Sequence, residues 1–188
     1  MQWNIPGTKL FIAQEDADGV QDMFESMFLP GDMVLSQVSG ITGLEAYTIQ
    51  NWVKRGFLSP PQRKRYSMNQ LCRLIHINML KNALPLESVR RLLEYVNGDL
   101  HREEDDIIDD AALYFLFVRL AARARQLDDP KVWQEALSAS LADYREPYPG
   151  AKQKIEKALS IMLTAWLASQ MRQSAERMLD EIKYNGER

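Results

Sequence analysis

The sequence predicts an all-α protein built from short amphipathic helices and one long helix. Apolar residues recur at helical spacing through most of the 188 residues. Helix-start signals precede several of these stretches, and Gly or Pro stands where many of them end. Hydrophobic residues make up 46% and charged residues 26% of the chain, which is typical of a folded globular protein and excludes wholesale disorder.

Residues 1–31 are expected to form an N-terminal extension. The apolar residues between Trp3 and Ile12 suit an extended segment. A short amphipathic helix is predicted near 18–28, because apolar residues return there at helical spacing. Pro30 and Gly31 should end that helix.

Residues 32–98 are predicted to form a compact domain of four short helices, of which two come first. Asp32 is the expected N-cap of a helix that runs to about Ser39. Gly40 and Gly43 then bracket a tight turn. A second helix is predicted over 45–55, with Ile49 and Trp52 on its inner face and Leu44 in the core beside it.

The second half of this domain contains residues that end helices and residues that start them. Gly56 suits the position after a helix end, and Pro60 with Pro61 forbids a helix, so a loop or small hairpin should follow. Ser67 and Gln70 form a capping box that opens the third helix. Pro85 suits the start of the fourth helix.

Residues 99–188 are expected to form a helical dimerisation region with a possible effector site. An acidic linker over 101–110 precedes a helix over 111–127, which is apolar nearly all round and therefore buried. Asp129 and Pro130 should open another helix. A loop over 145–150 leads into a long helix over 151–184.

Charge is distributed unevenly along the chain. The whole protein carries 23 Lys and Arg against 26 Asp and Glu, a net charge of −3. Residues 33–98 nevertheless hold nine basic and three acidic side chains. A basic module within an acidic chain suggests that one region meets a polyanion, although a solvated charged face is the alternative.

The basic residues follow a pattern that suits double-stranded DNA. A short helix, a glycine turn and a second helix can place that second helix in the major groove. Gln50 and Asn51 carry amides that can pair with adenine. The expected phosphate contacts are Lys54, Arg55, Arg63, Lys64 and Arg65, the last three on a loop stiffened by prolines.

Three motifs carry a family resemblance. They are TGLEAYTIQNWVKRGFL at 42–58, Lys64-Arg65-Tyr66 after it, and LPLESVRRLL at 84–93. Together they resemble the winged helix-turn-helix of the MerR regulators over about a third of the chain, and within that group most closely the uncharacterised DUF1836 family. The resemblance implies a dimeric DNA-binding transcription regulator with a small wing, and it adds Tyr47 and Tyr66 to the expected DNA-facing residues.

The sequence departs from the family pattern inside the second helix. Gln50 stands where the family usually has arginine, Asn51 where it usually has tyrosine, and Glu45 where it has a small capping residue. The operator sequence is therefore not implied by the resemblance. A protein-interaction module and an architectural or recombination accessory factor are the alternative functions.

Other kinds of site lack the residues they need. Cys72 and His76 fall below the ligand count of a zinc site, and the acidic run beside His101 is typical of a solvated surface. No glycine-rich phosphate loop is present, so we expect no enzyme and no cofactor. Aromatic residues after position 110 favour a core over a pocket for a small-molecule effector.

The compartment and the oligomeric state are also predicted. A single cysteine, the absence of a signal peptide and a longest uncharged run too short to span a bilayer favour a cytoplasmic protein with no membrane partner, nucleoid-associated when bound to DNA. The long helix would extend about 50 Å at roughly 1.5 Å per residue. Its apolar residues, including Leu163 and Met178, are expected to hold a homodimer, and the alternative is a monomeric helical bundle in which they are core.

Overall fold

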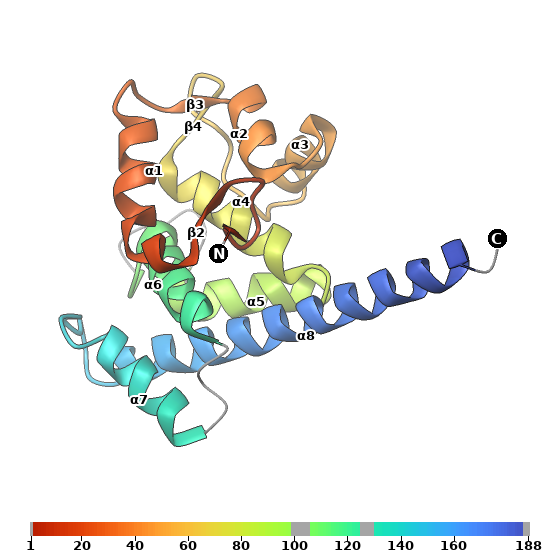
Figure 1. Ribbon diagram of the computed structural model, residues 1–188. Coiled ribbons are helices and arrows are strands. Elements are labelled where there is room, and N and C mark those ends of the chain that lie inside the picture. Colours follow the sequence, from red (N-terminus) through yellow and green to blue (C-terminus); the bar gives the residue numbers. More distant parts are fainter. Residues whose placement is uncertain (1, 99–105, 125–129, 186–188) are drawn as a thin grey trace.

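The computed structural model describes residues 2–98, 106–124 and 130–185 (Figure 1). These residues are mostly helical, as predicted, and they also form two small antiparallel sheets, β1–β2 and β3–β4. In chain order the elements are β1 (Gln2–Asn4), β2 (Phe11–Ala13), the 3-10 helix η1 (Gln14–Gly19), α1 (Val20–Phe28), β3 (Met33–Val34), α2 (Leu35–Thr42), α3 (Ala46–Lys54), β4 (Arg65–Tyr66), α4 (Met68–Leu80), α5 (Leu86–Asn97), α6 (Asp110–Arg123), α7 (Pro130–Ser140) and α8 (Ala151–Asn185).

The N-terminal extension packs onto the helices that follow it. β1 and β2 form a hairpin in which Trp3 pairs with Ile12. The loop of this hairpin is held by the Asn78 amide, which donates to the carbonyl of Gly7 at 3.0 Å, and by the Tyr114 hydroxyl, which donates to the carbonyl of Pro6 at 2.9 Å. The first strands and helices therefore share a core with α4 and α6.

The helix predicted after Asp32 begins later and ends later than expected. Asp32 is not its N-cap, because Met33 and Val34 extend as β3 and pair with β4. The side chain of Gln37 accepts a hydrogen bond from the Val34 amide at 3.0 Å and so caps the start of α2. α2 then continues to Thr42 and ends at Gly43, whose φ of 69° is readily adopted by glycine.

α4 lies at the centre of the fold, between the helices before and after it (Figure 1). The predicted capping box is present: the Gln70 amide donates to Ser67 Oγ at 3.3 Å, and the Ser67 amide donates to Gln70 Oε1 at 3.0 Å. Most of the side chains of α4 are buried, including Cys72 and His76. Pro85 precedes α5 as its N-cap.

α6 is buried on most sides, as the sequence predicted. It begins one residue earlier than expected, and the Asp109 carboxylate caps it by accepting from the Ala112 amide at 2.7 Å. The end of the predicted helix and the expected cap Asp129 lie outside the described residues. α7 begins at Pro130, where the sequence placed it.

α8 divides into two halves with different surroundings. Its first half packs into the body, with Ile155, Leu159 and Leu163 fully buried. Leu163 therefore belongs to the core of the protomer, and its assignment to a dimer interface was wrong. The second half projects from the body and exposes Met178 (Figure 1). No helix in the described part of the chain is long and apolar enough to cross a membrane.

One hydrophobic core joins the N-terminal extension to the first half of α8. It extends from Ile5 through Leu71 and Phe117 to Ala165. This core crosses both expected boundaries, after residue 31 and after residue 98. Through this core, α6 packs against η1 and α1, and both α6 and α8 pack against α4.

Candidate nucleic-acid interface

α3 has one face in the core and one in solvent. Ile49 and Trp52 are buried, as expected, and fix the helix to the domain. On the opposite face lie Tyr47, which is 77% exposed, and Gln50 and Lys54, which are also exposed. These three positions are separated by three and four residues, so they form one line along the helix.

The turn before α3 is tied down by its own side chains. The Thr42 hydroxyl donates to the carbonyl of Val38 at 2.8 Å and accepts from the Leu44 amide at 3.2 Å. Leu44 is buried. The angle between α2 and α3 is therefore set by buried contacts, and the exposed face of α3 is held in a defined direction.

The end of α3 places two cations at the surface. Lys54 is the last helical residue and Arg55 is the C-cap, followed by Gly56 with a φ of 73°. The guanidinium carbon of Arg55 lies 4.8 Å from the centre of the Phe57 ring, a cation–π contact that orients its charge. Asn51, by contrast, is half-buried beside the exposed line.

The wing loop, residues 62–65, is a two-residue hairpin turn. Gln62 and Arg65 pair across it, and the Arg65 amide donates to the carbonyl of Gln62 at 2.8 Å. The two central residues, Arg63 and Lys64, have φ values of 49° and 62°. Asn-Gly is the usual pair in such turns, because most residues other than Gly and Asn are strained at positive φ.

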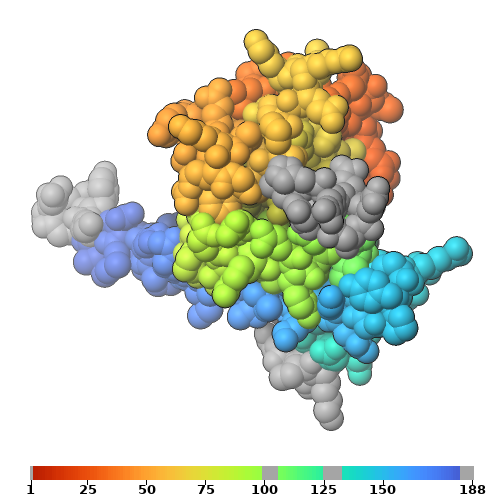
Figure 2. Space-filling view, turned by 180° about the vertical axis from the view of Figure 1, so that it is seen from behind, coloured from red at the N-terminus to blue at the C-terminus, as the bar shows by residue number. Residues whose placement is uncertain are grey.

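The residues of the wing loop do not all point outward. Arg63, Lys64 and Arg65 are exposed, and the loop stands out from the surface in Figure 2. Arg65 also donates from Nη1 to the carbonyl of Asp32 at 2.7 Å, so part of its guanidinium serves the fold. Tyr66 is only 3% exposed and packs in the core, which removes it from the predicted DNA-facing set.

We give the name α3–wing surface to the predicted DNA-facing residues other than Tyr66, including the half-buried Asn51. It comprises Tyr47, Gln50, Asn51, Lys54, Arg55, Arg63, Lys64 and Arg65. Helix α2 contacts both α3 and β4 and so connects its two parts. The surface combines amides that can read base edges with cations that can bind phosphates.

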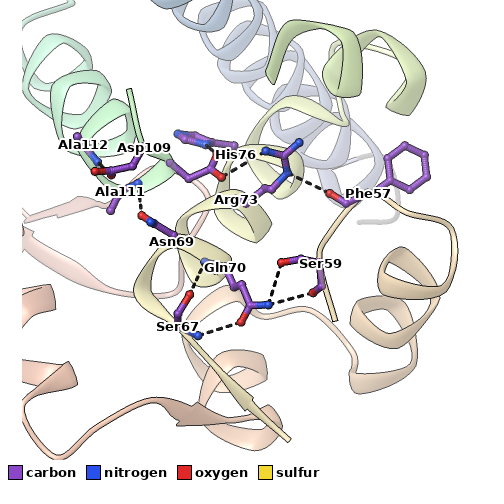
Figure 3. A network of polar contacts seen from close by, with 11 residues as sticks. Phe57, Ser59, Ser67, Asn69, Gln70, Arg73, His76, Asp109, Ala111 and Ala112 are labelled. Atoms are coloured by element: carbon purple, nitrogen blue, oxygen red, sulfur yellow. Dashed lines mark hydrogen bonds and ion pairs between the residues drawn. The ribbon is translucent and has the colours of Figure 1, made fainter. Parts of the chain in front are cut away.

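A polar network behind this surface was not predicted (Figure 3). Gln70 and Arg73 of α4 bind backbone carbonyls of the linker, residues 57–61, which joins α3 to the wing loop. Arg73 also pairs with Asp110 of α6 at 3.3 Å. The signal for Arg73 was present, since a lone cation inside the apolar run LCRLIHI needs a buried partner.

The other candidate site residues are buried in the core or lie outside the described residues. Burial raises the pKa of the Cys72 thiol well above its usual range, with a further contribution from the charge of Asp110. Among the described residues, no group of three or more His, Cys, Asp and Glu could hold a metal ion. His101 is outside the described residues.

The aromatic residues of α6 belong to the core, and Phe115 also lines a groove at its edge. Tyr114, Phe115 and Phe117 are buried, and their rings pack against Phe24 and Trp166. An open groove of about 670 Å³ does lie between α1, the start of α4, α6 and the end of α7. Its volume is within the range of small-molecule sites, roughly 300–1,000 Å³.

Comparison with known proteins gives a family match and a distant relative. The family described as Domain of unknown function (DUF1836) matches residues 4–117. Uncharacterized protein YkrK of Bacillus subtilis (strain 168) is 31% identical over 84 residues, which cover 43% of this chain. The match spans 36% of that relative's length, well under two thirds of it. No solved structure matches the chain.

Proposed function

The chain belongs to the DUF1836 family, and we propose that it binds double-stranded DNA in a sequence-specific manner as a MerR-like winged helix-turn-helix transcription regulator. The observation that carries this proposal is the wing loop. Two cationic residues, Arg63 and Lys64, occupy strained positions where Asn-Gly would fit more easily. Strain of this kind gathers at functional sites.

The chemistry of the α3–wing surface supports the same proposal. Gln50 is aligned with Lys54 on the exposed face of α3, so one helix would present an adenine-reading amide and a phosphate-binding ammonium together. Tyr47 stands at the start of that line. Arg63 and Lys64 would bind phosphates beside the groove that α3 enters.

We further propose that the protein acts as a homodimer through α8. Seven exposed positions follow one another at alternating spacings of three and four residues, which is the repeat of a coiled-coil seam. We call this set, which is apolar except for Thr164, the apolar stripe: Ile161, Thr164, Ala168, Met171, Ala175, Met178 and Ile182. Two-fold pairing would double the DNA footprint of a single short helix.

The test is selection of bound duplexes from a random pool, followed by footprinting. A regulator should enrich one motif, arranged as two half-sites if the protein is a dimer. Binding of all duplexes with steep salt dependence and no enriched motif would favour an architectural factor. No duplex binding at low salt would reject the DNA proposal and favour the protein-interaction module.

Light scattering tests the dimer separately. One chain has a mass of 21.7 kDa. A protein mass of one chain at micromolar concentration, both free and with the selected duplex, would reject the homodimer.

A cytoplasmic location, with nucleoid association when DNA is bound, is part of the same proposal. Any small-molecule effector would most simply occupy the groove between α1, α4, α6 and α7.

A further inference from the structure

The polar side of α4 holds the backbone of the linker. The side-chain amide of Gln70 donates to the carbonyl of Ser59 at 3.0 Å, to Ser59 Oγ at 3.0 Å and to the carbonyl of Pro60 at 3.2 Å. Nε of Arg73 donates to the carbonyl of Phe57 at 3.2 Å (Figure 3). One face of one helix thus binds three of the linker's carbonyls.

The linker sets the spacing between the two parts of the α3–wing surface. α3 ends at Lys54 and the wing loop starts at Gln62, so the intervening residues determine how far the loop stands from the exposed face of α3. Phe57 and Leu58 anchor the first part of the linker in the core, whereas Pro60 and Pro61 have no amide hydrogens to donate, so the second part is attached through its carbonyls. A groove and its flanking phosphates have a fixed separation, so binding both requires a fixed spacing.

Arg73 also reaches the start of α6. Its Nη1 lies 3.3 Å from Asp110 Oδ2, and both residues are buried. Oδ1 of Asp110 faces His76 Nδ1 at 3.5 Å. Nearby, Asn69 Oδ1 accepts a hydrogen bond from the Ala111 amide at 3.1 Å. The same arginine therefore connects α6 to the linker.

We propose that Gln70 and Arg73 are positioning residues of the α3–wing surface, and that Asp110 couples their position to α6. The inference rests on the proposed DNA-binding function and names how that site is regulated. A shift of α6 would move Asp110, change the hold of Arg73 on Phe57, and alter the spacing that duplex DNA requires. Segments beyond α6 would influence DNA affinity without touching DNA.

The first test is Gln70→Glu. A carboxylate oxygen can still accept from the Ser67 amide and still suits the start of a helix, so the cap of α4 is kept. The other oxygen would face the carbonyl oxygens of Ser59 and Pro60, which can only accept, and would repel the linker. Affinity for the selected duplex should fall about fivefold or more, as expected for a coupled site, with little change in the denaturant midpoint.

Gln37→Glu is the matched control. Gln37 occupies the equivalent capping position of α2, and its oxygen accepts from the Val34 amide. Its amide nitrogen has no hydrogen bond within the described residues. The exchange adds the same charge to the same domain without touching the linker, so it should change affinity much less than Gln70→Glu. Equal losses in the two variants would overturn the positioning role.

The second test compares Asp110→Asn with Asp109→Asn. Both remove one negative charge from the first turn of α6, and asparagine remains a good cap in place of Asp109. Only Asp110 pairs with Arg73 among the described residues. Asp110→Asn should weaken duplex binding by the folded protein about fivefold, and Asp109→Asn should not. Loss of stability alone, with unchanged affinity, would overturn the coupling.

Amide hydrogen exchange separates this inference from the proposed function. Exchange over residues 57–65 should become faster in Gln70→Glu and Asp110→Asn than in the two control variants, with or without DNA. Unchanged exchange would overturn the positioning role. Faster exchange in a protein that binds no duplex would instead overturn the DNA proposal and leave the link between α6 and the linker in place.

Discussion

The α3–wing surface and the apolar stripe of α8 are both exposed, yet they are supported in different ways. α3 presents its polar line while Ile49 and Trp52 anchor its other side in the core. From Met171 onward α8 has exposed residues on most sides, so the C-terminal part of its stripe has no such anchor. The first surface lies within residues 4–117, which match the family, and the second lies outside them.

This difference indicates what each surface is suited to bind. A helix fixed by its own core is already positioned for a rigid ligand such as duplex DNA. Binding therefore costs little conformational entropy. A projecting helix with an apolar seam has unburied surface that a partner helix would cover. The predictions below test that distinction, beginning with the largest expected effect.

The largest effect should separate the two halves of α8. Leu163→Ala removes a fully buried side chain and should lower the free energy of unfolding by about 2–5 kcal/mol. Met178→Ala is the matched variant, because Met178 is 61% exposed, and in dilute protein it should change stability by less than about 0.5 kcal/mol. Urea unfolding followed by circular dichroism measures both. Similar losses of stability in the two variants would mean that both halves of α8 are packed alike.

The next effect belongs to the exposed line of α3. Gln50→Ala should weaken binding to the selected duplex by about 1–3 kcal/mol and leave binding to random duplexes nearly unchanged, because only a base-edge contact carries sequence information. Asn51→Ala should act in the same direction and more weakly, since Asn51 is half-buried. Competition assays with both duplexes provide the measurement. Equal losses on the two would reject base reading.

Local signals in the sequence were enough to predict much of this architecture. The capping box of Ser67 and Gln70 marks α4 because both partners lie within one turn. The inner face of α3 follows from helical spacing alone. The start of α2 was predicted wrongly because Met33 pairs with Tyr66, a partner distant in sequence.

The polar network was missed, and Leu163 was assigned first to a dimer interface, for the same reason. Arg73 and Asp110 are 37 residues apart, and no local pattern joins them. Apolar residues recur along the whole of α8, but only in its first half do such residues, Leu163 among them, find a core to pack against. Sequence periodicity identifies an apolar face, whereas the tertiary fold decides whether that face is covered within the protomer.

A smaller effect should distinguish neighbouring positions near the end of α8. Met178 belongs to the apolar stripe, whereas Leu179 lies beside it and is 59% exposed. Met178→Gln should therefore weaken self-association by about 1 kcal/mol more than Leu179→Gln, in proportion to the apolar area that a seam position buries. Sedimentation equilibrium gives both dissociation constants. The reverse order would place the seam on another face of the helix.

The smallest expected effect is that of Lys64→Gly, which should raise stability and lower DNA affinity. Lys64→Gly relieves the strain of a positive φ, a gain that the extra freedom of glycine in the unfolded chain partly offsets, so stability should rise by less than about 1 kcal/mol. The same change removes a phosphate contact, which should weaken binding to all duplexes and reduce the slope of log affinity against log salt by about 1. Lys64→Gln, which loses the charge but keeps the strain, should reproduce the loss of slope without the gain in stability. A Lys64→Gly variant with an unchanged slope would show that the strained lysine is ordinary solvated surface, and it would leave α3 as the part of the surface that meets DNA.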